Sequence, residues 1–148
     1  MTATAHALVG GVIAATTKDP LLGATLSLMS HPLLDMVPHW DFAWGWRDKS
    51  RVLLFCEATG DLLGGLLLAY LFFGANISFW YLSLCVFLAL SFDFIEVPYW
   101  FFGWRFFPFS VLHSFQSKIQ GKAKLPWGVI NQIIVVSLII FVFTHSNF

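Results

Sequence analysis

Two long apolar runs, at residues 52–73 and 126–144, constrain the fold of this chain more than any other feature. Each is long enough for a helix that crosses a bilayer, since a hydrocarbon core of roughly 30 Å needs about 20 apolar residues. The second run contains no acidic or basic residue. Because 58% of all residues are hydrophobic and only 11% are charged, we expect an integral membrane protein.

Three further apolar stretches predict membrane-embedded helices, at residues 4–17, 21–36 and 77–97. The first would be only about 21 Å long, so it either tilts inside a bundle or inserts halfway. A short helix over 108–120 is expected at the membrane interface. The predicted fold class is therefore all-α: a polytopic helical bundle of about five membrane-embedded helices and one interfacial helix, in a single domain over residues 1–148. Gly60, Gly64 and Gly65 are expected to allow close helix packing.

The basic residues predict how these helices are oriented. Six of the eight gather in two loops, Arg47–Arg51 and Lys118–Lys124, and the positive-inside rule places both loops in the cytoplasm. The uncharged turn at 74–76 is then outside the cell. These assignments predict a protein of the cell (inner) membrane with a cytoplasmic N-terminus and an external C-terminus. Eight basic and eight acidic residues leave no net charge, so no nucleic-acid partner is expected.

Residues 30–41, with the sequence SHPLLDMVPHWD, contain a concentration of candidate metal ligands and no Lys or Arg. The four ligand-type side chains are His31, Asp35, His39 and Asp41. The first two lie one helical turn apart. Pro38 should end the helix and turn the following residues back toward the same end. Imidazole nitrogen beside carboxylate oxygen suits zinc, manganese or iron better than calcium or magnesium.

Several carboxylates lie in apolar stretches that contain no Lys or Arg: Asp35, Glu57, Asp61, Asp93 and Glu96. A charged carboxylate within a membrane costs at least a few kcal/mol, so protons or a metal ion must compensate this group. Glu57 could instead pair with Arg47 or Arg51, and Glu96 with Arg105.

Two more histidines, His6 and His113, are expected at the same membrane face as the cluster. His113, Gln116 and Gln120 follow one face of the interfacial helix. The predicted metal ligands are His6, His31, Asp35, His39, Asp41 and His113. They would hold one or two divalent transition-metal ions, with zinc favoured and manganese or iron as alternatives.

The early Ala-His pair, the His-x-x-x-Asp spacing and the Pro-His-Trp-Asp segment resemble the YdjM-like family of inner-membrane, metal-dependent hydrolases. The resemblance covers mainly residues 5–41 and implies a membrane protein with a hydrolytic metal centre. Matched by motif, the ligands that it implies are His6, His31, Asp35, His39 and Asp41. The chain departs from the Asp-x-Asp-His order of that family, which leaves the individual roles of His39 and Asp41 open.

The predicted function is hydrolysis of an ester or phosphoester, lipid-linked and held at the cytoplasmic membrane interface, by a metal-activated water molecule. Asp61 and Asp93 are the candidates for the catalytic base, since they lie deeper than Glu57 and Glu96. One alternative is a divalent-cation transporter or channel, which would need ligands at several membrane depths. Another is a structural membrane subunit in which the metal stabilises the fold. The expected partners are membrane lipid and the substrate, with the oligomeric state left open.

Overall fold

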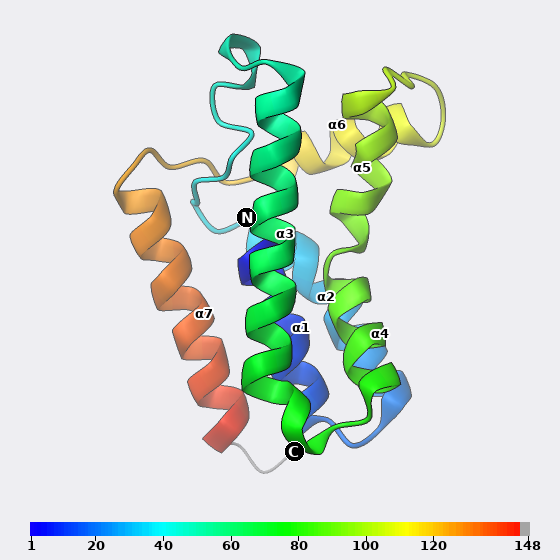
Figure 1. Cartoon of the computed structure of the whole chain (residues 1–148), viewed down its shortest axis with the longest axis vertical. Coiled ribbons are helices and arrows are strands. Elements are labelled where there is room, and N and C mark those ends of the chain that lie inside the picture. The colour runs from blue at the N-terminus through cyan, green and yellow to red at the C-terminus, as the bar shows by residue number, and fades with distance from the viewer. Residues whose placement is uncertain (146–148) are drawn as a thin grey trace.

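The computed structural model describes residues 1–145, and over that range the protein is all-helical, without a β-strand (Figure 1). The helices are α1 (Ala3–Thr16), α2 (Pro20–Asp35), α3 (Arg51–Phe73), α4 (Phe79–Ala89), α5 (Ser91–Phe101), α6 (Phe109–Ile119) and α7 (Trp127–His145). Short 3₁₀ helices lie before and after α3, at Trp46–Asp48 and Gly74–Asn76. The predicted external C-terminus concerns residues 146–148, outside the described range.

Helix α1 forms the centre of the molecule and contacts α2, α3, α4 and α7. It begins at Thr2, whose hydroxyl accepts a hydrogen bond from the backbone N–H of Ala5. Nearly every residue from Ala5 to Ala14 is buried, as expected for a helix that is apolar on all sides. Its alanines and glycines allow the neighbouring helices to approach closely. At 14 residues, α1 is a core helix that is too short for a full span.

Two helices within residues 1–145 are long and apolar enough to cross a membrane. One covers Arg51–Asn76, with a mean hydropathy of 1.7, and the other is α7, with a mean hydropathy of 2.2. A third span results if α4 and α5 are counted as one bent helix. The prediction of about five spanning or embedded helices is therefore too high for full spans. Its excess comes from α1 and α2, which have 14 and 16 residues and are too short for a full span.

The predicted helix over 77–97 is in fact two helices, α4 and α5, which meet at an angle of 52°. The hydroxyl of Ser91 donates to the carbonyl of Leu88 at 2.7 Å, a local bond that competes with regular helix geometry. The break leaves the carbonyl of Ala89 to accept a hydrogen bond from His31 on α2 at 2.6 Å. Pro98 does not end the helix as its position suggests, since α5 continues to Phe101.

The glycines of α3 differ in their surroundings. A Cβ atom at Gly65 would lie 2.7 Å from the Cα of Thr4, so this glycine allows the backbones of α1 and α3 to touch. A Cβ atom at Gly60 or Gly64 would meet no atom within 4 Å. The prediction of close packing is thus confirmed for Gly65 and wrong for the other two.

We predict that Gly65→Ala lowers the free energy of unfolding by about 1–3 kcal/mol, because the methyl group would press on the backbone of α1. Gly64→Ala is the matched control and should be neutral or stabilise by up to about 1 kcal/mol through helix propensity. Thermal unfolding of both variants in detergent measures the difference. Equal effects of the two substitutions would contradict the close approach of α1 and α3 at Gly65.

Candidate metal centre

The centre lies where the first turns of α1, the end of α2 and the start of α5 come together, near the middle of the molecule (Figure 1). Helix α6 lies across this region and contacts both α2 and α5. Four segments that are distant in the sequence thus each contribute polar side chains to one place. The surrounding core is apolar, so these side chains depend on one another for compensation.

His6, His31 and Asp93 form a group that could hold a metal ion, with one ligand atom from each lying within 4.8 Å of the others. The imidazole rings of His6 and His31 are stacked, with centroids 3.9 Å apart and an interplanar angle of 8°. Both histidines are fully buried, whereas the Asp93 side chain is 39% exposed. The group is therefore open on the side of α5.

Asp35 adds a buried carboxylate to this group. Its Oδ1 lies 3.2 Å from His6 Nε2, and its Oδ2 lies 3.4 Å from His31 Nε2. The Nε2 of Gln116 on α6 donates to Oδ2 at 3.3 Å, and the terminal amine of Met1 forms an ion pair with Oδ1. Neighbouring ligand atoms of a tetrahedral zinc ion, each about 2.1 Å from the metal, lie about 3.4 Å apart, and both histidine–carboxylate spacings are close to this value.

The tautomer of His31 follows from its hydrogen bond to α4. Its Nδ1 is the donor to the carbonyl of Ala89, since a carbonyl oxygen only accepts. In a neutral ring, Nε2 is then a lone-pair acceptor, and it faces oxygens of Asp35 and of Asp93, the latter at 3.6 Å. Facing acceptors repel unless a proton or a cation lies between them. Backbone fixation of one imidazole nitrogen is typical of metal-binding histidines.

Two buried polar atoms of the centre have no hydrogen-bond partner within residues 1–145: His6 Nδ1 and Gln116 Oε1. Buried polar groups are usually paired, because an unpaired one costs about 1–3 kcal/mol. The donor types in the centre, imidazole nitrogen and carboxylate oxygen, are those that transition metals accept. These residues therefore fit a divalent transition metal, and the geometry does not identify which one.

His39 and Asp41 form a second part of the centre, next to Asp35. His39 Nε2 lies 3.5 Å from Asp41 Oδ2 and 3.9 Å from Asp35 Oδ1, while its Nδ1 donates to the carbonyl of Val37. Gln120 donates to Asp41 Oδ2 at 2.9 Å. Burial raises the pKa of Asp41, but the interactions with His39, the terminal amine and the backbone N–H of Ala43 together outweigh burial, so the pKa lies below its ordinary value.

Backbone hydrogen bonds hold His39 in place. Its N–H donates to the carbonyl of Gly121, its carbonyl accepts from Ala123 at 2.9 Å, and Gly121 N–H donates to the carbonyl of Asp35 at 2.7 Å. A Cβ atom at Gly121 would lie 2.6 Å from the carbonyl oxygen of Met36, so a glycine is required for this contact. We call this pairing of residues 35–39 with 121–123 the backbone strap.

Two of the predicted site residues, Asp61 and His113, lie outside the candidate metal centre. Asp61 binds the start of α1, accepting from the backbone N–H of Ala3 at 2.6 Å and from the hydroxyl of Thr4 at 2.7 Å. A carboxylate is favourable there because the N-terminus of a helix is partly positive. The Nδ1 of His113 lies 3.2 Å from Glu96, and its ring stacks on Tyr99 with centroids 3.9 Å apart.

The predicted arginine partners of the two glutamates are wrong. Glu57 pairs with Lys49, with 2.7 Å between Oε2 and Nζ. The ammonium group of Lys49 also donates to the carbonyl of Phe42. Glu96 accepts from the indole of Trp100 at 3.0 Å and pairs with His113. The Glu57–Lys49 pair therefore joins α3 to the loop before it, and the Glu96–His113 pair joins α5 to α6.

One polar residue with an organising role was missed. Gln132 lies in α7, which the sequence suggested to be plain scaffold. Its amide oxygen accepts from the backbone N–H of Thr2 at 3.0 Å, and its Nε2 donates to the carbonyl of Trp40 at 2.6 Å. An amide in an otherwise apolar run was the available signal. Gln132 thereby joins α7 to the start of α1 and to the segment that carries His39 and Asp41.

Comparisons with protein-family models, with curated proteins and with solved structures found no match to this chain. The class that the fold and site define is an all-helical protein with two to three candidate membrane spans and a buried histidine–carboxylate group that could hold a metal ion.

We predict that purified protein contains a transition metal and that His31→Ala loses most of it, because His31 is buried at the centre of the group. Stability should fall with occupancy, since the remaining carboxylates lose their compensation. His113→Ala is the discriminating control and should retain the metal, as its ring pairs with Glu96. Metal content by mass spectrometry and thermal unfolding with and without chelator provide the measurements. Metal loss in His113→Ala alone would contradict the centre described here.

Proposed function

We propose that the protein is a membrane-embedded, metal-dependent hydrolase that acts on a lipid-linked ester or phosphoester at the cytoplasmic membrane interface. The observation that carries this proposal is that the group of His6, His31 and Asp93, which could hold a metal ion, adjoins the buried carboxylate of Asp35 and is exposed only on the side of Asp93. The resemblance to YdjM-like hydrolases supports the same function. The proposed metal is zinc, with manganese or iron as alternatives and one or two ions in the centre.

The four side chains divide into ligands and a base. Catalytic zinc sites use three protein ligands and leave one position open, and His6, His31 and Asp35 are the three buried candidates. Asp93 is half-exposed at the opening and is placed to accept a proton from a water molecule there. A divalent cation, when bound, would supply a Lewis acid and lower the pKa of that water. His39 and Asp41 would hold a second ion or orient Asp35.

Asp61 is the weaker of the two candidate bases. Three hydrogen bonds from Ala3 and Thr4 occupy its carboxylate, including one from the backbone N–H of Thr4 at 3.2 Å. We propose that it positions α1, and with it His6, which lies two residues beyond Thr4. Asp61 would then act on the reaction through His6.

The proposed substrate is a lipid because candidate membrane spans flank the centre. Asp93 belongs to the bent pair of α4 and α5, and α3 contacts the start of α1. The segment from α5 to α6 exposes large aromatic side chains, a composition typical of the membrane interface. These side chains are Phe102, Trp104, Phe106 and Phe107. A lipid phosphoester lies at the depth of such residues.

We predict that Asp93→Asn retains bound metal and lowers turnover of a phospholipid by on the order of a hundredfold or more, because the amide cannot accept a proton. Phosphatidic acid and phosphatidylglycerol in detergent micelles are the test substrates, assayed with and without chelator. His145→Ala, in an exposed residue at the end of α7, serves as the control.

Metal loss in Asp93→Asn would make Asp93 a ligand and exclude it as the separate base. Absence of hydrolysis by the wild type, together with metal transport into liposomes, would replace the hydrolase by the transporter.

We also predict that single cysteines at Asp48 and Lys122 are labelled from the cytoplasmic side, and a cysteine at Asn76 from the outside. The loops before α3 and after α6 lie at the same end of the molecule, opposite the turn after α3 (Figure 1). A membrane-impermeant maleimide applied to cells and to inverted vesicles provides the measurement, in a background without Cys56 and Cys85. Labelling of positions 48 and 122 from opposite faces would contradict the proposed orientation.

A further inference from the structure

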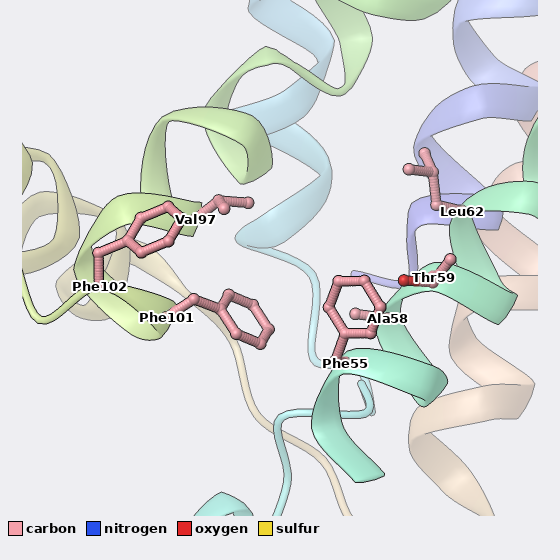
Figure 2. A pocket seen from close by; sticks show the side chains of 7 residues that line it. All are labelled: Phe55, Ala58, Thr59, Leu62, Val97, Phe101 and Phe102. Atoms are coloured by element: carbon pink, nitrogen blue, oxygen red, sulfur yellow. The ribbon is translucent and has the colours of Figure 1, made fainter. Parts of the chain in front are cut away.

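A groove with a volume of about 480 Å³ lies between α3 and α5. Figure 2 shows Phe101 pointing from α5 toward Phe55 on α3, with Val97 on the wall of Phe101 and Thr59 on the wall of Phe55. The seven lining residues are Phe55, Ala58, Thr59, Leu62, Val97, Phe101 and Phe102. Thr59 is the one polar residue among them, so the groove favours an apolar occupant.

The wall formed by α5 leads directly to the candidate metal centre. Asp93, Val97 and Phe101 are spaced four residues apart, so they form one stripe along the helix. Two of them line the groove, and the third is the half-exposed carboxylate of the centre. The apolar groove and the open side of the centre are therefore consecutive parts of one helix face.

The wall formed by α3 ends at the same place. Leu62 lines the groove and also packs against the core cluster that contains Ala7, the neighbour of His6. Asp61, beside Leu62, binds the start of α1. At the other end, the rings of Phe55 and Phe101 are in edge-to-face contact with centroids 6.0 Å apart. The groove thus runs from an aromatic contact to the first turns of α1.

The surroundings and size of the groove point to its occupant. Both walls belong to candidate membrane spans, α3 and the bent pair of α4 and α5, so the nearest apolar molecules are lipid chains. One turn of a helix about 10 Å wide occupies roughly 420 Å³, which is close to the volume of the groove. The groove is therefore too small for a docked helix of several turns. One flexible hydrocarbon chain fits this space.

We propose that the groove binds one hydrocarbon chain of a membrane lipid, next to the open side of the metal centre. Reaction of the lipid at the metal centre rests on the proposed hydrolase function, whereas binding of the chain does not. The groove then selects amphiphiles with a long chain, and the metal centre acts on whatever ester or phosphate the chain presents.

The test uses wild-type protein in lipid nanodiscs that contain a phosphatidylcholine with a photoreactive diazirine in one acyl chain. Illumination, digestion and mass spectrometry locate the labelled residues. We expect several-fold more label on residues 55–62 and 97–102 than on the exposed residues Ile133, Ile134 and Phe141 of α7. Ala58→Trp should remove the excess by filling the groove. Leu67→Trp, an exposed position of α3 outside the groove, should leave it unchanged.

A second measurement separates the groove from the hydrolase. Ala58→Trp should lower hydrolysis of a long-chain phosphoester several-fold and leave a four-carbon-chain analogue unaffected, with the metal content unchanged. Excess label in the groove without any hydrolysis would uphold the lipid site and refute the hydrolase. Uniform labelling of α3, α5 and α7, or equal loss on both substrates in Ala58→Trp, would overturn the proposal.

Discussion

The buried carboxylate of Asp35 is the constraint on which the rest of the structure depends. Its two oxygens contact side chains of α1, α2 and α6 and the segment after α2. An isolated charge in an apolar interior costs several kcal/mol, so these helices must converge on it in a definite register. Close backbone contacts, at Gly65 between α1 and α3 and at Gly121 in the backbone strap, make that register possible.

The sequence was most informative where a local rule acts. Apolar run length placed α3 and α7 to within a residue or two, and proline positions placed the starts of α2 and α6 equally well. The one-turn spacing of His31 and Asp35 correctly predicted their contact, 3.4 Å between Nε2 and Oδ2. The approach of His6 to Asp35 followed from the expected antiparallel course of α1 and α2.

The sequence was least informative where tertiary partners decide. At the bend between α4 and α5 the Ala89 carbonyl bonds to His31, 58 residues away, and no local spacing encodes that contact. Asp61 and Asp93 look alike in the sequence, as acids within apolar stretches, yet one binds the start of α1 and the other faces His31. His113 lies on the expected face of α6, but Glu96 of α5 is its partner. The rotation of each helix about its axis and the competition between neighbouring side chains determine which partner each of these residues contacts.

The backbone strap has a consequence for the order of assembly. It joins residues 35–39 to residues 121–123, and Gln132 of α7 also holds the carbonyl of Trp40. During synthesis α1 and α2 are made first, and their histidines and Asp35 must wait for about eighty further residues before α6 supplies Gln116. Contacts so distant in the chain form late. The centre can therefore be completed only after α6 has been made, and its completion joins the two earliest helices of the protein to a late one.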